Sequence, residues 1–128
     1  YLNRAIMTPF VLFDSAYRCN VLTCAAPNYT VAHKYYEITE TANYEALCSR
    51  IKFVLMCCAD SHSDILILGA YGCGVFGQDA RCVAKIFKQY LDKEFKNVFQ
   101  KVVFAIPDDK NYQAFSDIFG NSKDGDFR

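Results

Sequence analysis

Hydrophobic and polar positions follow two different periods along this chain, and the changes of period predict strands and helices in turn. Short β-rich runs occupy residues 9–13 and 20–25, and apolar residues at helical spacing extend from about residue 41 to residue 59. The predicted order is strand, strand, helix, strand, glycine-rich loop, helix, strand and helix. This alternation is typical of an α/β fold.

The two longer predicted helices, residues 41–59 and 79–95, each have an apolar face and a polar face. Residues predicted to face inward are Tyr44, Leu47, Ile51, Val54, Leu55 and Cys58 in the first helix and Ala80, Val83, Ala84, Phe87 and Leu91 in the second. Arg50 is assigned to the outward face of the first helix, together with Asn43, Glu45, Ser49 and Lys52. Such helices bury one stripe against a sheet.

Three predicted strands, residues 21–25, 65–68 and 102–106, are connected through helices and should therefore be parallel. Their carboxyl ends would then share one edge of the sheet. The loops that follow them, residues 26–29, 69–77 and 107–109, would converge there. Ligands of open α/β sheets bind outside the carboxyl ends of the strands, so this edge is the predicted ligand site.

The loop after the second of these strands carries the strongest chemical signal. Gly69, Gly72, Gly74 and Gly77 fall within nine positions, directly before a predicted helix. Glycines leave backbone amides uncovered, and a helix N-terminus attracts anions, so the loop indicates a phosphate site. The alternative is that the glycines only serve a tight turn between strand and helix.

Residues 72–77 also satisfy the G-x-G-x-x-G pattern of dinucleotide-binding domains. That pattern calls for an acidic residue at the end of the next strand, about 20 residues on, whereas here the next strand ends much later, near Asp108. A nicotinamide or flavin domain is therefore the minor alternative. A Walker A loop is excluded because Gly-Lys-Ser/Thr does not follow.

Composition limits the remaining possibilities. The chain has 128 residues, 52% of them hydrophobic, with 14 basic and 14 acidic side chains. This predicts one globular domain over residues 1–119 and a polar, flexible tail over residues 120–128. Balanced charge without a basic block argues against DNA or RNA binding, and the apolar runs are too short to span a membrane. We expect a cytosolic protein, in its own cell or delivered to a host.

Cysteine and histidine patterns indicate neither disulfides nor a metal. Seven cysteines, an odd number, include no CxxC pair, and neither His33 nor His62 has zinc-ligand spacing to a cysteine pair. We expect buried thiols, no metal and no cofactor. Cys73 at a helix start is a candidate nucleophile because a helix N-terminus lowers a thiol pKa, but a small residue between two glycines also suits the turn.

Two motifs resemble those of a known family, the microbial-type poly(ADP-ribose) glycohydrolases, which are macrodomain-like. The motifs are Ala-Ala-Pro-Asn at residues 25–28 and Gly-Ala-Tyr-Gly-Cys-Gly-Val-Phe-Gly at residues 69–77, and the strand at residues 101–106 also matches. The resemblance extends from about Met7 to about Phe119. It implies a three-layer α/β/α fold with a mixed, partly parallel sheet and a crevice for ADP-ribose or its polymer.

The resemblance also implies roles for individual residues. Backbone amides of the glycine loop would bind the diphosphate, and Phe76 would pack against a ribose, with apolar cover of the helix start as the alternative role for Phe76. The predicted ligand-binding residues are Gly69, Ala70, Gly72, Cys73, Gly74, Val75, Phe76, Asn28 and Asp108. For Asn28 and Asp108, a role in shaping their own loops is the alternative. Asp79 is predicted to cap the following helix.

Members of this family carry a second glycine-rich loop and a Gln-Glu-Glu signature that acts on the glycosidic bond, and both are missing from this sequence. We therefore expect the C-terminal portion of such a domain, lacking its N-terminal elements. It is either part of a longer hydrolase or a non-catalytic reader, and no catalytic residue is assigned. A sheet without its first strands would expose an edge, which predicts a homo-oligomer.

Overall fold

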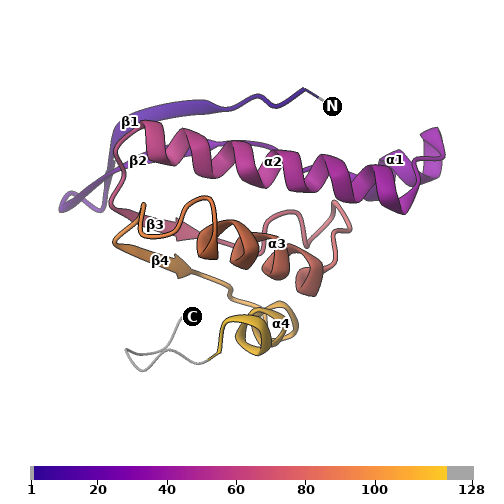
Figure 1. Ribbon diagram of the computed structural model, residues 1–128. Helices are drawn as coiled ribbons and strands as arrows, with labels where there is room; N and C mark the ends of the chain where they lie inside the picture. The colour runs from indigo at the N-terminus through magenta and orange to yellow at the C-terminus, as the bar shows by residue number, and fades with distance from the viewer. Residues whose placement is uncertain (1, 121–128) are drawn as a thin grey trace.

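The computed structural model describes residues 2–120 as a mixed α/β structure. The predicted tail, apart from Gly120, lies outside the described residues. Figure 1 shows α2, α3 and α4 one below another, with β3 and β4 beside α3. The elements are β1 (Ile6–Phe13), β2 (Tyr17–Thr23), α1 (Tyr29–Tyr36), α2 (Glu40–Asp60), β3 (Ile65–Leu68), α3 (Ala80–Asp92), β4 (Lys101–Phe104) and α4 (Asp109–Phe119).

The strands form two pairs. β1 and β2 form an antiparallel hairpin, and β3 pairs with β4 in parallel, with Ile65 opposite Lys101 and Leu68 opposite Phe104. The α/β class and the mixed, partly parallel character are therefore confirmed. The expectation that β2 would be a third parallel strand of the same sheet is wrong, because β2 is hydrogen-bonded only to β1. The hairpin turn is short, and its residues Asp14 and Ser15 both have positive φ.

A bulge interrupts the hairpin where Pro9 has no N–H to donate to the ladder. The register shifts between Thr8 and Val11, and Phe10 has a φ of 56°. The Phe10 N–H donates instead to the Asn20 side-chain oxygen, at 3.2 Å. The proline thus bends β1 without leaving this donor unpaired.

The core lies between α2, α3 and the β3–β4 pair. Leu47, Ile51 and Leu55 of α2 meet Val83 and Phe87 of α3 there, and each is at most 1% exposed. Phe87 and Phe115 both contact the Phe104 ring, with centroids 5.4 and 5.0 Å away. The predicted inward faces are confirmed except for Tyr44, which is 46% exposed.

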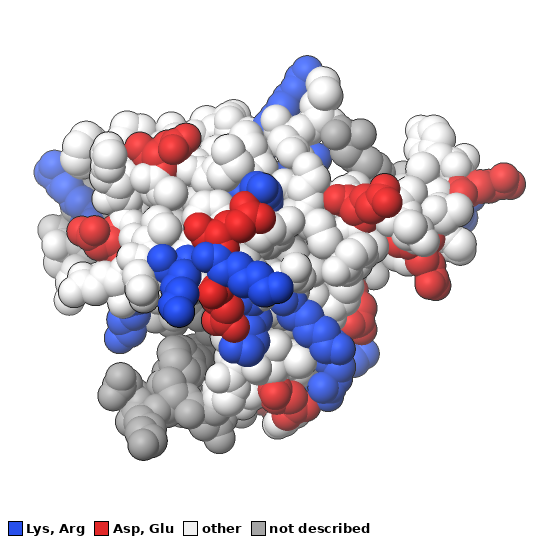
Figure 2. Space-filling model, viewed as in Figure 1, with Lys and Arg blue, Asp and Glu red and all other residues white. Residues whose placement is uncertain are grey.

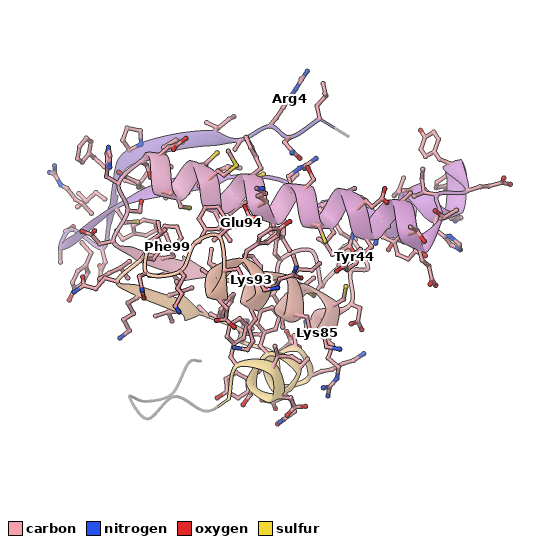
Figure 3. All side chains as sticks on the ribbon, viewed as in Figure 1. Arg4, Tyr44, Lys85, Lys93, Glu94 and Phe99 are labelled. Carbon is pink, nitrogen blue, oxygen red and sulfur yellow. The ribbon has the colours of Figure 1, made fainter. Side chains whose placement is uncertain are left out.

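The outer helix faces carry ion pairs. Arg81 pairs with Asp117 at 2.7 Å and so joins α3 to α4. Lys52 of α2 pairs with Glu94, which Figure 3 shows between α2 and the end of α3. Figure 2 shows basic and acidic side chains mixed over this face of the molecule. Within residues 2–120, no helix is long and apolar enough to cross a membrane.

Candidate binding site at the glycine loop

The loop between β3 and α3 is folded by its own backbone. Successive amides donate to carbonyls a few residues earlier and close a series of tight turns. The bonds are Tyr71 to Gly69 (2.9 Å), Cys73 to Ala70 (3.0 Å), Gly77 to Gly74 (3.0 Å) and Gln78 to Gly72 (3.0 Å). The Cys73 amide, which we predicted to bind diphosphate, is therefore already used within the loop.

Two glycines are required by this turn structure. Gly72 and Gly77 have φ values of 76° and 71°, a backbone conformation that residues other than glycine rarely adopt. A Cβ at position 72 would lie 2.8 Å from the Ala26 Cβ, and one at position 77 would lie 2.4 Å from the Thr30 Oγ1. For these two positions, the turn alone explains the glycine.

Gly74 has no such internal reason to be glycine. A Cβ at this position would meet no atom within 4 Å, and its φ lies outside the left-handed range. Within residues 2–120, the amides of Gly74, Val75 and Phe76 have no hydrogen-bond acceptor. The Val75 side chain beside them is 89% exposed. Uncovered consecutive backbone amides are a common form of anion site.

The loop is joined to the Ala-Ala-Pro-Asn segment that follows β2. The Phe76 carbonyl accepts from the amides of Tyr29 and Thr30, at 2.9 and 3.2 Å, and the Val75 carbonyl accepts from the Thr30 hydroxyl at 3.1 Å. These donors belong to the first turn of α1, whose N-cap is Asn28; the Asn28 side chain accepts from the Val31 amide at 3.1 Å. The predicted meeting of these two loops is confirmed, with Asn28 shaping its own loop.

Gln78 is a functional candidate that the sequence did not indicate. Its side chain is 6% exposed and donates to the Pro27 carbonyl at 2.8 Å. It also exchanges two hydrogen bonds of 2.9 Å with the side-chain amide of Asn43 on α2. One residue thus holds together the glycine loop, α2 and the Ala-Ala-Pro-Asn segment at residues 25–28, which we call the proline loop. No spacing rule marks a lone glutamine before a helix cap, so only the fold reveals this role.

The third predicted loop also reaches the site. A cavity of about 490 Å³ separates the glycine loop from the start of α4 and is lined in part by Cys73, Gln78, Asp79, Lys110 and Asn111. Asp108 caps α4, because one of its oxygens accepts from the Asn111 amide at 2.9 Å and the other from the Asn111 side chain at 3.0 Å. As predicted, Asp79 caps α3 by accepting from the Cys82 amide at 2.8 Å.

The surroundings of Cys73 do not favour a nucleophile. Burial and the nearby carboxylates of Asp79 and Asp108 raise the pKa of the Cys73 thiol to about 12. The thiol contacts the Tyr71 carbonyl at 3.6 Å. Burial, together with the two carboxylates, outweighs the effect of the helix N-terminus on the thiol pKa, so the thiol stays protonated near neutral pH. The packing interpretation of Cys73 is the one this geometry favours.

Arg50 was predicted to be exposed, and that prediction is wrong. It is 5% exposed and donates to the Asn3 side-chain oxygen at 2.8 Å, to the Leu2 carbonyl at 3.0 Å and to the Ala25 carbonyl. Its position three residues after Leu47 and four before Val54 places it on the buried face of α2. The Tyr71 hydroxyl donates to the Cys24 carbonyl at 3.0 Å, so the end of β2 is fixed from two directions.

The histidines and cysteines of the described residues do not form a metal site or a disulfide. Within residues 2–120, no group of three or more His, Cys, Asp or Glu side chains could hold a metal ion. A ring nitrogen of His33 lies 3.4 Å from the Ile38 carbonyl, and His62 is exposed after the end of α2. All seven cysteines are free. The site is therefore built from backbone amides, carbonyls and side-chain amides.

Comparisons with protein-family models and with curated proteins gave no match. Solved structures do match. The poly(ADP-ribose) glycohydrolase of Deinococcus radiodurans in complex with ADP-ribose is 29% identical, with a TM-score of 0.78 over 84% of this chain and 45% of that one. The glycohydrolase of Thermomonospora curvata is 33% identical, with a TM-score of 0.75 over 84% of this chain and 41% of that one.

This chain therefore spans less than half the length of the solved structures that it matches. That share fits the prediction that it corresponds to the C-terminal part of the domain. With identity near 30%, the likeness extends to the amino-acid sequence as well as to the arrangement of helices and strands. The chain has the fold of part of a microbial poly(ADP-ribose) glycohydrolase, as its two sequence motifs indicated.

Proposed function

We propose that this chain binds ADP-ribose at the glycine loop, with the diphosphate on the amides of Gly74, Val75 and Phe76. The observation that carries the proposal is that these three consecutive amides have no acceptor within residues 2–120 and that the space beside Gly74 is open. The Deinococcus radiodurans glycohydrolase, which shares this fold, was crystallised with ADP-ribose.

The electrostatics of the loop suit a diphosphate bound without a dedicated cation. Backbone N–H groups carry partial positive charge, and successive uncovered amides are a common binding site for oxyanions. The neighbouring cavity, lined by Lys110 and Asn111, offers room of about 490 Å³ for the rest of the ligand. Exposed Val75 and half-buried Phe76 supply apolar surface for a ribose or base.

We propose binding without cleavage for residues 1–128. The carboxylates next to the loop, Asp79 and Asp108, both accept hydrogen bonds at helix N-termini. Among the glutamates, Glu94 pairs with Lys52 at 2.8 Å, and Glu37, Glu40 and Glu45 lie on exposed parts of α2 or at the end of α1. Glycosidic cleavage needs a carboxyl group placed at the bond. Hydrolysis by a longer protein containing this chain remains a separate proposal.

Titration calorimetry with ADP-ribose tests the binding proposal, with NAD⁺ and AMP as comparison ligands. We expect ADP-ribose to bind more tightly than AMP, because AMP offers a single phosphate to the amides of the loop, and the NAD⁺ titration tests the dinucleotide alternative. Equal or tighter binding of NAD⁺ would favour the dinucleotide alternative. No heat and no melting shift at millimolar ADP-ribose would contradict the proposal.

A charge substitution at the tip of the loop localises the site. Val75→Asp should weaken ADP-ribose binding by about tenfold or more, because like charges repel across a short distance. Val98→Asp is the matched control, since Val98 is also an exposed loop valine, at 45% against 89% for Val75. Both variants should melt near the wild-type temperature. Equal losses of affinity in the two would place the ligand elsewhere.

The reader proposal is tested separately by incubating the chain with poly(ADP-ribose). We expect retention of the polymer and no release of free ADP-ribose, measured by chromatography. The Deinococcus radiodurans glycohydrolase serves as the positive control for cleavage. If this chain releases ADP-ribose and the Val75→Asp variant does not, the reader proposal is wrong and the chain is an enzyme.

A further inference from the structure

The uncovered amides of the glycine loop belong to consecutive peptide units, and each unit carries a carbonyl that shows how it is turned. In a trans peptide, the C=O of one residue and the N–H of the next point in opposite directions. Every peptide bond of the described residues is trans. The contact that a carbonyl makes therefore sets the direction of the amide that follows it.

The direction of the Val75 amide is set by the loop itself. The Gly74 carbonyl, in the same peptide unit, accepts from the Gly77 amide at 3.0 Å on the inside of the turn. The Val75 amide therefore points out of the turn. Both partners of this bond are backbone groups of the loop, so no side chain is needed for it.

The direction of the Phe76 amide depends on a side chain from another element. The Val75 carbonyl, in the same peptide unit, accepts from the Thr30 hydroxyl at 3.1 Å. This bond turns the Phe76 amide away from α1. Within residues 2–120, no other donor reaches the Val75 carbonyl. One hydroxyl thus fixes the peptide unit that carries the last of the three uncovered amides.

Packing does not hold this peptide unit in place. The Val75 side chain is 89% exposed, and a Cβ at Gly74 would meet no atom within 4 Å. Glycine also leaves the backbone more freedom than any other residue does. If the unit rotated, the partly negative Val75 oxygen would replace the Phe76 amide at the open side of the loop and repel a phosphate.

Thr30 is placed by α1, and α1 is in turn held by the loop. The amides of Tyr29 and Thr30 donate to the Phe76 carbonyl, which satisfies two amides that a helix cannot pair internally. Within residues 2–120, Ala32 is the one buried residue of α1, and no residue of this helix joins the hydrophobic core. Figure 1 shows α1 beyond the end of α2. A helix of eight residues is not stable alone, so α1 and the loop stabilise each other.

We propose that Thr30 is a positioning residue: from the first turn of α1, its hydroxyl turns the Phe76 amide toward the diphosphate of ADP-ribose. This inference rests on the proposed function of the glycine loop and adds that binding depends on α1. Coupling between two events is reciprocal, so ADP-ribose should also stabilise α1 against the loop.

Calorimetric titration of ADP-ribose into three variants tests the role of the hydroxyl. Thr30→Val removes it and should weaken binding by about threefold to tenfold, the factor expected for one hydrogen bond. Thr30→Ser keeps it and should restore most of the affinity. Thr39→Val is the matched control, because the Thr39 hydroxyl accepts from the Ala42 amide at 3.1 Å at the start of α2. This control should lower the melting temperature and leave the affinity unchanged.

Amide resonances separate positioning from a general loss of structure. ADP-ribose should shift the resonances of Gly74, Val75 and Phe76 in the unaltered chain, and Thr30→Val should reduce the shift of Phe76 more than the other two. Hydrogen exchange of the Tyr29 and Thr30 amides should also slow when ADP-ribose binds the unaltered chain. The exchange measurement needs no variant, so it decides the matter if Thr30→Val does not fold.

The outcomes distinguish this inference from the function on which it rests. An unaltered chain that does not bind ADP-ribose contradicts both. Where the unaltered chain binds, full affinity in Thr30→Val, no recovery in Thr30→Ser, or unchanged exchange at Tyr29 and Thr30 would each overturn the positioning role and leave the binding site in place.

Discussion

At the scale of single residues, the glycine loop contains two kinds of glycine. Gly72 and Gly77 are fixed by positive φ and by close neighbours, whereas Gly74 has open space around it. The sequence shows four equivalent glycines and predicts a phosphate loop, but it does not separate those that the turn needs from those that a ligand needs. Backbone dihedral angles and neighbouring atoms provide that distinction.

Alanine substitutions should separate these two roles. Gly77→Ala should lower the free energy of unfolding by about 1–2 kcal/mol or more, because alanine at positive φ is strained and its Cβ would contact Thr30. Gly74→Ala should leave stability unchanged and weaken ADP-ribose binding by about tenfold, since a methyl group would stand where a phosphate approaches. Urea denaturation and calorimetry measure the two effects. Unchanged affinity in Gly74→Ala would contradict this site.

At the scale of elements, the predictable features are those with a strong period or a clear cap. The 3.6-residue pattern predicted α2 and α3, and β3 was predicted with its observed bounds, because their apolar residues meet one common core. α1 was not among the predicted elements. Its sequence favours β structure, and only Ala32 in it is buried. Contacts with the Phe76 carbonyl, distant in sequence, stabilise its first turn.

The Gln78–Asn43 pair should couple the glycine loop to α2. Gln78→Leu leaves the Asn43 amide and the Pro27 carbonyl without this partner and should cost about 1–3 kcal/mol of unfolding free energy. Adding Asn43→Leu should cost less than the sum of the two single changes, by about 0.5–3 kcal/mol. A double-mutant cycle in urea gives the coupling. Strict additivity would mean that the pair does not act as a unit.

The cap of α3 should matter for stability and little for the ligand. Asp79→Ala removes the acceptor for the Cys82 amide and should lower the unfolding free energy by about 1 kcal/mol. ADP-ribose binding should persist, because the amides assigned to the diphosphate precede this cap in the loop. Complete loss of binding with unchanged melting temperature would refute the capping role and make Asp79 a ligand contact.

At the scale of the whole molecule, the sequence predicted the fold class, the core and the convergence of loops, but not how the strands are divided. β2 was expected in one sheet with β3 and β4, since strands joined through helices are usually parallel neighbours. In the structure β2 stays with β1. Strand order depends on which edges meet in space, and residues 65–68 carry no pattern that specifies the neighbour on their second edge. In the same way, the sequence pattern did not predict that the charged side chain of Arg50 is buried.

Protonation of buried thiols gives the whole fold a predictable sensitivity to alkali. Burial raises the pKa of Cys58 to about 11, and burial with nearby carboxylates raises that of Cys73 to about 12, from an ordinary value of 9.0. Above pH 9 the unfolded chain releases thiol protons that the folded chain retains, so the contribution of these thiols to stability should fall between pH 9 and 12 and stay constant below that range.

Urea midpoints measured from pH 7 to pH 11 check this alkaline loss. Cys73→Ala should flatten the decline above pH 9, whereas Cys19→Ala, which changes an exposed thiol on β2, should leave the slope unchanged. A decline of the same steepness in both variants would show that the Cys73 thiol does not contribute.

Hydrogen bonds of Arg50 connect the first residues of the chain to the binding site, so that a force on one is transmitted to the other. Its guanidinium group joins the Leu2 carbonyl and the Asn3 side chain to the Ala25 carbonyl, and Ala25 begins the segment that ends at Asn28. A pulling force or a bulky fusion at the N-terminus would therefore act on the proline loop and, through Gln78, on the glycine loop. For immobilised or single-molecule binding assays, the attachment point belongs at the opposite end of the chain.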